Sequence, residues 1–227
     1  MTDIARKWIR KQARFKGIFN KKGGFDRVIP LSAVQRFDEC REYIREAYES
    51  GLDGTQVKKL EEELRRFMGL GYALALNSGE AALHLAIKLL GEKLYGQPQA
   101  GHGTLEGRRV FCSDMTFDAT VNPVCYEGGI PVFIDTERDT WNMDPAALER
   151  AFTLYPEVKM VVVAHLYGTP GKIDEIRKIC DAHGALIVED AAESFGAAYH
   201  VSPSSPFYTC TGMEDKNGKW IQTGMFG

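Results

Sequence analysis

Along the chain, stretches with the apolar spacing of a helix alternate with short, continuous apolar runs. From Ile29 onward, stretches with the 3.6-residue spacing of an amphipathic helix occur at Val34–Ser50 and Gln56–Met68. One apolar stripe on the second stretch is formed by Val57, Leu60, Leu64 and Phe67. Both stretches are therefore predicted to be helices.

Short apolar runs alternate with further amphipathic stretches over the rest of the chain. Strands are predicted at Tyr72–Leu76, Arg109–Ser113, Pro131–Asp135, Lys159–Leu166 and Ala185–Glu189. Helices are predicted at Glu80–Leu90, Thr120–Tyr126, Asp144–Phe152 and Ile173–His183. Asp144 would cap the third of these helices, with Pro145 in its first turn. This alternation predicts an α/β fold with a mostly parallel sheet that helices cover on both faces.

Polar motifs follow several of the predicted strands directly. They are NSGE at 77–80, CSDMTF at 112–117, HLYG at 165–168 and EDAAE at 189–193. In parallel sheets with helices on both faces, ligands bind outside the carboxyl ends of the strands. The acids that follow the last strand are therefore expected to point into a site.

Two segments look like insertions into this alternating pattern. Residues 91–107 form a Gly-rich loop between a helix and a strand. Residues 197–222 contain a Pro- and Ser-rich stretch and then a hairpin turn signal at Asn217–Gly218.

Residues 1–28 stand apart as a basic extension, with nine Lys or Arg against two Asp. Ile4, Trp8 and Phe15 could share one face of a short helix, so a membrane-surface or acidic-partner role is one reading. A solvated extension packed on the body by its few apolar residues is the interpretation we favour. Residues 29–227 would then form the main domain.

The composition is typical of a soluble globular protein, with 44% hydrophobic residues, 26% charged residues and a net charge of −3. No stretch has the length and apolarity of a membrane span, no secretory signal is visible, and the charge gives no nucleic-acid footprint. The five cysteines are scattered, without a CxxC pair. Their number and spacing argue against a disulfide framework and against a zinc site, and favour a reducing, cytoplasmic compartment.

Each candidate motif has a chemical and a structural reading. Ser78, Gly79 and Glu80 begin a helix, where backbone N–H groups favour a phosphate, although a plain capped helix start is equally compatible. Phe117 is either a core residue or a platform for a flat ring, and His165 is either packed or part of a site.

The acids after the last strand are the sharpest feature of the sequence. Glu189, Asp190 and Glu193 could be helix caps, or carboxylates held for a cationic ligand with small alanines leaving room for it. A buried carboxylate is costly unless it meets a cation or several hydrogen-bond donors.

Taken in order and spacing, four stretches of the chain resemble one family. They are NSGEAALHLAI, DMTFDATVNPVCYEGGIPVFIDTERDTWNMDPAALERAF, VVVAHLYGTPGKIDEI and LIVEDAAESFGAAY. The resemblance is to the DegT/DnrJ/EryC1/StrS group of pyridoxal-phosphate-dependent sugar aminotransferases, and it runs from about Ile29 to Gly227. It implies an aspartate aminotransferase-like, fold type I large domain, incomplete at the C-terminus because the last strands and the small domain would be absent.

The resemblance also implies a role for each candidate residue toward pyridoxal 5′-phosphate. Asp190 would pair with the pyridine nitrogen, Glu193 would lie near the ring hydroxyl, and Phe117 would stack on the ring face. Ser78, Gly79 and the backbone of Glu80 would bind the phosphate, and His165 would lie on the substrate side of the site.

The family further implies the substrates and the assembly. The substrate would be a nucleotide-linked keto sugar, with a UDP-linked 4-keto-6-deoxy-N-acetylhexosamine favoured, and glutamate would be the amino donor. The reaction would belong to surface polysaccharide or glycan synthesis. A homodimer would be expected, because in this family a second subunit commonly completes the site.

Two departures from the family pattern leave alternatives open. The phosphate-binding turn is SGE instead of SGT, so weaker cofactor binding is expected unless Glu80 turns away from the phosphate. The motif SFNGNK, whose lysine the family uses for catalysis, would fall shortly beyond Gly227, and Lys216 and Lys219 do not match it. The alternatives are a catalytically inactive remnant, one half of a split enzyme, or a sugar dehydratase of the same fold.

Overall fold

The computed structural model describes residues 37–205, 208, 212–225 and 227. The basic extension predicted at 1–28, and its boundary with the main domain, lie outside these residues. The chain divides into two compact units, Met1–Asp53 and Gly54–Gly227. In the first unit, helix α2 occupies Glu39–Glu49, within the helix predicted at Val34–Ser50.

A parallel four-stranded sheet is the centre of the second unit. Its strands are β1 (Arg109–Ser113), β2 (Ile130–Ile134), β3 (Met160–Ala164) and β4 (Leu186–Asp190), in the order β2-β1-β3-β4. Each of the three pairings is parallel, as the alternating pattern predicts. The register pairs Ala164 with Asp190, so β3 and β4 end side by side.

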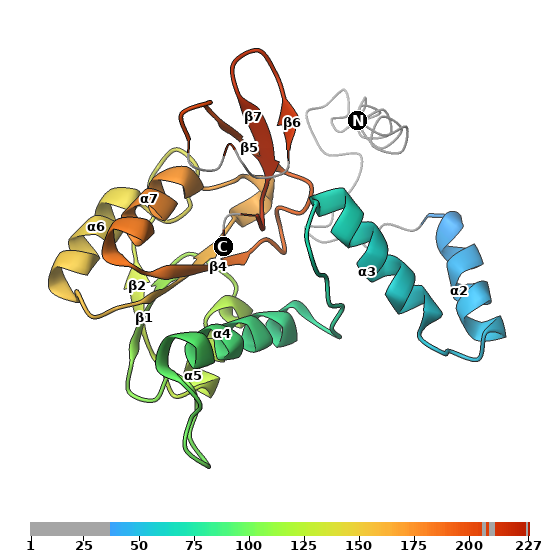
Figure 1. Ribbon diagram of the computed structural model, residues 1–227, viewed down its shortest axis with the longest axis horizontal. Coiled ribbons are helices and arrows are strands. Elements are labelled where there is room, and N and C mark those ends of the chain that lie inside the picture. Colours follow the sequence, from blue (N-terminus) through green and yellow to red (C-terminus); the bar gives the residue numbers. More distant parts are fainter. Residues whose placement is uncertain (1–36, 206–207, 209–211, 226) are drawn as a thin grey trace, which may run out of the picture. The chain divides into compact units, whose positions relative to one another are not determined.

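Helices cover both faces of this sheet (Figure 1). The helices of this unit are α3 (Thr55–Met68), α4 (Gly79–Tyr95), α5 (Asn122–Tyr126), α6 (Pro145–Leu154) and α7 (Ile173–His183). Strand β3 shows how the two-residue period divides the core. Val161 and Val163 pack in one cluster with residues of α6 and α7, whereas Met160 and Val162 pack in another with residues of α4 and α5.

The prediction of a strand at Tyr72–Leu76 is wrong. This segment has no regular secondary structure, and no strand among the described residues pairs with it. Tyr72 is 94% exposed, and the backbone N–H of Ala75 is bound by the Glu61 carboxylate at 2.9 Å. An apolar run becomes a strand only where a neighbouring backbone offers hydrogen bonds, and here a side chain supplies one of them.

The first predicted insertion, residues 91–107, is a loop only after Tyr95, where α4 ends, and Glu127 holds this loop within the second unit. One carboxylate oxygen of Glu127 accepts hydrogen bonds from the backbone N–H and the hydroxyl of Thr104, at 2.8 and 3.0 Å. Its other oxygen lies 2.7 Å from His84 Nε2 on α4. Burial raises the pKa of Glu127, but these hydrogen bonds outweigh it and the pKa is lowered.

The second predicted insertion forms a small antiparallel sheet. Its strands are β5 (Ala198–Val201), β6 (Met213–Glu214) and β7 (Lys219–Gln222), in the order β5-β7-β6. The hairpin predicted at Asn217–Gly218 joins β6 to β7, and Asp215 accepts both backbone N–H groups of that turn. None of the helices among the described residues is long and apolar enough to cross a membrane.

Candidate functional site

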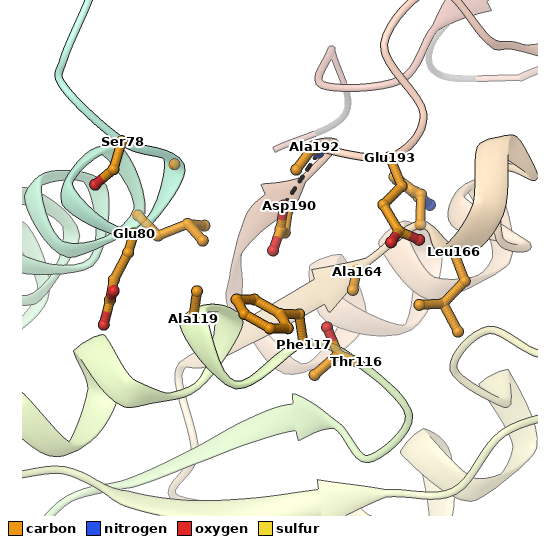
Figure 2. A pocket seen from close by; sticks show the side chains of 13 residues that line it. Ser78, Glu80, Thr116, Phe117, Ala119, Ala164, Leu166, Asp190, Ala192 and Glu193 are labelled. Atoms are coloured by element: carbon orange, nitrogen blue, oxygen red, sulfur yellow. Dashed lines mark hydrogen bonds between the residues drawn. The ribbon is translucent and has the colours of Figure 1, made fainter. Parts of the chain in front are cut away.

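A pocket of about 350 Å³ lies at the carboxyl ends of the sheet strands (Figure 2). Its walls come from the start of α4, the loop after β1, and the segments that follow β3 and β4. All seven candidate residues line it: Ser78, Gly79, Glu80, Phe117, His165, Asp190 and Glu193. The structure therefore brings together residues that are up to 115 positions apart in the chain, and the volume falls in the range of small-molecule sites.

Asp190, the last residue of β4, presents its carboxylate to this pocket. Oδ2 accepts a hydrogen bond of 2.5 Å from the hydroxyl of Thr120, and Oδ1 accepts one of 3.1 Å from the backbone N–H of Ala192. A donor on each oxygen fixes the plane of the carboxylate. The Asp190 carboxylate is thus held in one orientation toward the pocket.

The start of α4 forms another part of the pocket wall. Ser78 is the N-cap in an extended conformation, and its hydroxyl oxygen accepts a hydrogen bond of 3.1 Å from the backbone N–H of Ala81. The first N–H groups of a helix have no partner within the helix, and here they belong to Gly79 and Glu80. A side chain at Gly79 would contact nothing within 4 Å, so the space beside this turn is open to a ligand.

Glu80 turns away from this helix start, as Figure 2 shows. Its Oε1 accepts a hydrogen bond of 2.6 Å from the phenol of Tyr126, at the end of α5. That hydrogen bond is the main reason why the pKa of Tyr126 is raised. The carboxylate of Glu80 therefore has a hydrogen-bond partner of its own, away from the start of α4.

Phe117 is 75% exposed and is therefore not a core residue. It precedes a 3₁₀ turn at Asp118–Thr120, in which the backbone N–H of Thr120 binds the Phe117 carbonyl at 3.1 Å. The turn places the aromatic ring at the pocket and the Thr120 side chain in the interior, where Thr120 is fully buried.

His165 contributes to the pocket wall, but its side chain is buried. Nδ1 accepts a hydrogen bond of 3.1 Å from the backbone N–H of Gly171, so the ring proton is on Nε2. Nε2 lies 3.0 Å from Glu189 Oε2 and donates to it. Both ring nitrogens are therefore occupied by protein groups, which gives His165 a packing role beside the pocket.

Glu189 and Asp190 point to opposite faces of β4, as adjacent strand residues must. The Glu189 side chain is only 2% exposed, and besides His165 it accepts hydrogen bonds from the backbone N–H groups of Gly224 and Gly227, at 2.9 and 2.7 Å. The first acid of the pair therefore ties β4 to the segment at 224–227, and only the second belongs to the pocket.

Glu193 accepts a hydrogen bond of 2.8 Å at Oε2 from the backbone N–H of Tyr167. Tyr167 has a left-handed backbone, with φ of 52°, and is followed by Gly168 with φ of 82°. A non-glycine residue in this region is strained, and such strain concentrates at functional sites. The Glu193 carboxylate stabilises this turn at the edge of the pocket.

Sequence reasoning missed two residues that organise the site, Thr116 and Thr120, and it grouped Glu189 with the acids that face the ligand. The hydroxyls of Thr116 and Thr120 lie 2.7 Å apart and lead to Asp190. A threonine in a loop has no signal of its own in one sequence. For Glu189, the two-residue period of β4 was the available signal, because it separates the two acids onto different faces.

The comparisons with known proteins agree on one family. The model of the DegT/DnrJ/EryC1/StrS aminotransferase family matches residues 35–213. EpsN of Bacillus subtilis (strain 168), named as a pyridoxal phosphate-dependent aminotransferase, is 44% identical over 186 residues, which are 79% of this chain and 45% of EpsN. GDP-perosamine synthase of Caulobacter vibrioides is 31% identical over 202 residues, which are 88% of this chain and 51% of that enzyme. A sugar 3-dehydratase of Saccharopolyspora spinosa also matches, at 32% identity over 76% of this chain and 36% of that protein.

Solved structures give the same result for the fold. The sugar aminotransferase CalS13 of Micromonospora echinospora superposes with a TM-score of 0.65 at 27% identity, over 78% of this chain and 47% of CalS13. The predicted aspartate aminotransferase-like fold is thereby confirmed, and pyridoxal phosphate is confirmed as the cofactor of the family. The chain spans about half the length of the curated relatives it matches. It belongs to the DegT/DnrJ/EryC1/StrS aminotransferase family.

Proposed function

We propose that this chain forms the cofactor-binding part of a pyridoxal-phosphate-dependent aminotransferase that acts on a nucleotide-linked keto sugar. The family membership supports the reaction class, and the pocket supports the cofactor. A UDP-linked 4-keto-6-deoxy-N-acetylhexosamine as acceptor, glutamate as donor, cytoplasmic surface-polysaccharide or glycan synthesis, and a homodimer that completes the site are the finer parts of the proposal.

The single observation that carries the proposal is that one pocket has a site for an anion and a site for a cation. The N-terminus of α4 favours an anion, and Asp190 favours a cation, and both line the same cavity. Pyridoxal phosphate has a phosphate at one side of its ring and a basic nitrogen at another. A carboxylate that keeps this nitrogen protonated stabilises the positive charge on the ring.

The remaining pocket residues fit the same cofactor. Phe117 offers an exposed aromatic face on which a planar ring can stack, and Ser78 and Gly79 leave open space at the helix start. Glu193 would lie near the ring hydroxyl, with one oxygen already bound to the Tyr167 backbone. When bound, the protonated ring supplies an electron sink that lets the substrate amine lose a proton from its α-carbon.

Binding of the cofactor tests the site. Pyridoxamine 5′-phosphate, which carries its own amine, is titrated into the protein and followed by its fluorescence. We expect saturable binding, weakened about tenfold or more by Asp190→Asn, because a bond between two charged groups is lost. Asp181→Asn is the matched control, since Asp181 lies on the surface and pairs with Arg177. Absence of binding to the unchanged protein, or equal binding by the two variants, would contradict the proposal.

A labelled donor distinguishes the reaction classes. The protein is incubated with pyridoxal phosphate, a UDP-linked 4-keto-6-deoxy-N-acetylhexosamine and ¹⁵N-glutamate, and the sugar is analysed by mass spectrometry. Gain of ¹⁵N by the sugar shows amination. Loss of a hydroxyl group without ¹⁵N would show a dehydratase, the alternative that the Saccharopolyspora spinosa relative suggests. Cofactor binding with no change in the sugar would favour a non-catalytic protein or one half of a split enzyme.

A further inference from the structure

Two threonine hydroxyls and the Asp190 carboxylate form a continuous hydrogen-bonded chain. Thr120 Oγ1 lies 2.5 Å from Asp190 Oδ2, and Thr116 Oγ1 lies 2.7 Å from Thr120 Oγ1. An ionised carboxylate can only accept hydrogen bonds, so the Thr120 hydroxyl is the donor of the hydrogen bond to Asp190. Its oxygen is then free to accept from Thr116, which makes the direction of the chain Thr116 to Thr120 to Asp190.

The surroundings hold this chain rigidly. Thr120 is fully buried, and the 3₁₀ turn at Asp118–Thr120 is closed by backbone hydrogen bonds from Thr120 to Phe117 and from Val121 to Asp118. The second oxygen of Asp190 is bound by the Ala192 backbone N–H at 3.1 Å. Asp190 therefore receives one donor from its own loop and one from a segment 70 residues earlier in the chain.

The same short turn serves two sides of the pocket. It exposes Phe117 and buries Thr120, so the aromatic platform and the carboxylate-orienting hydroxyl belong to one rigid segment. A movement of this turn would shift both groups together. Their relative position is thereby fixed before any ligand enters.

We propose that Thr120 is a positioning residue that orients the Asp190 carboxylate toward a protonated ring nitrogen, and that Thr116 supports it by orienting the Thr120 hydroxyl. This inference rests on the proposed function. A hydrogen bond donated to the carboxylate favours its ionised form, and a fixed carboxylate lies ready to bind the ring N–H without losing side-chain freedom on binding. Thr120 acts only through Asp190 and does not itself touch the ring.

The test compares two ligands that differ at one atom. Pyridoxamine 5′-phosphate has the ring nitrogen, and its 1-deaza analogue has a carbon in that place. For each protein variant the dissociation constants of both compounds are measured by fluorescence titration. A role through Asp190 and the ring nitrogen affects only the first compound, whereas a general disturbance of the pocket affects both.

Thr120→Val removes the hydroxyl and keeps the shape of the side chain. We expect it to weaken pyridoxamine 5′-phosphate binding about tenfold, as expected for a lost hydrogen bond to a charged group, and to change binding of the deaza analogue less than twofold. Thr120→Ser keeps the hydroxyl and should bind both compounds within about twofold of the unchanged protein. Thr116→Val, at a partly exposed position, should weaken only pyridoxamine 5′-phosphate, by about threefold, and it provides the test if Thr120→Val fails to fold.

The protonation of the ring nitrogen gives a second readout. In pyridoxamine 5′-phosphate labelled with ¹⁵N in the ring, the pH at which the bound nitrogen loses its proton should fall in Thr120→Val and stay unchanged in Thr120→Ser. Equal weakening of both ligands by Thr120→Val, or no weakening of either, would overturn the inference while leaving the proposed function in place. Failure of the unchanged protein to bind pyridoxamine 5′-phosphate would instead overturn the proposed function itself.

Discussion

Replacing Glu189 by glutamine tests the reasoning about the two acids at the end of β4. Glu189 is buried and accepts hydrogen bonds from His165 and Gly224 on Oε2 and from Gly227 on Oε1. Glutamine has nearly the same shape but only one acceptor oxygen and an amide that donates. In its better orientation it would still accept from His165 and Gly224, and its amide would face the Gly227 N–H.

The magnitude follows from these three hydrogen bonds. Two of them would change from bonds to a charged acceptor into bonds to a neutral one, at about 1 kcal/mol each. The lost acceptor at Gly227 costs up to about 1 kcal/mol, at the low end because Gly227 is exposed and water can reach its N–H. We therefore expect Glu189→Gln to lower the free energy of unfolding by about 2–3 kcal/mol, and the melting temperature by about 5–10 °C for a chain of this size.

Thermal unfolding followed by circular dichroism measures this change. Glu157→Gln is the matched control, because Glu157 makes an exposed ion pair of 3.1 Å with Arg109 and should shift the melting temperature by no more than about 2 °C. The two variants lose the same charge, so their difference isolates the burial of Glu189. Equal melting temperatures would refute the claim that Glu189 is a structural acceptor.

Three further outcomes are expected. Burial raises the pKa of Glu137, but hydrogen bonds, led by that from Thr140, lower it to about 2. The stability that Glu137 contributes is thus present above about pH 4.5 and lost as the pH falls toward 2, and urea unfolding of Glu137→Gln should show a smaller loss over that range. Tyr126→Phe frees the Glu80 carboxylate to approach the helix start, so it should weaken pyridoxamine 5′-phosphate binding about threefold. Adding Glu80→Gln to this variant should restore binding. Unchanged binding in Tyr126→Phe would show that the hydrogen bond is not what keeps Glu80 away. Burial raises the pKa of the Cys112 thiol to about 12, so Cys112 should resist alkylation by iodoacetamide in the folded protein while exposed Cys40 reacts, as peptide mass spectrometry can check.

Much of the architecture was determined by the sequence alone. The short apolar runs and the helical period of the segments between them predict β1 to β4 and the helices that cover them, and the structure confirms these elements. The motifs after β1, β3 and β4 identify four pocket residues, because the carboxyl ends of parallel strands lie at one edge of a sheet, and the start of the helix predicted at Glu80–Leu90 identifies the other three. These features depend on local spacing, which one sequence displays directly.

The tertiary structure decided what each polar group binds. The run at Tyr72–Leu76 has a strand-like composition, but strand formation needs a partner backbone, and Glu61 binds it instead. The sequence places a carboxylate in the first turn of α4, and only the folded chain brings Tyr126, 46 residues away, to bind Glu80 away from the helix start. Whether a polar side chain can be buried depends on donors and acceptors that are distant in sequence, because a buried polar group is stable only when it forms hydrogen bonds.

The two adjacent acids of β4 show what the sequence determined and what the tertiary structure decided. The strand period determines that Glu189 and Asp190 face opposite ways. Only the folded chain brings His165 and the backbone at 224–227 to the first acid, and Thr120 to the second. The sequence thus determined where the carboxylates stand, and the long-range packing decided that one of them holds the fold together while the other faces the pocket.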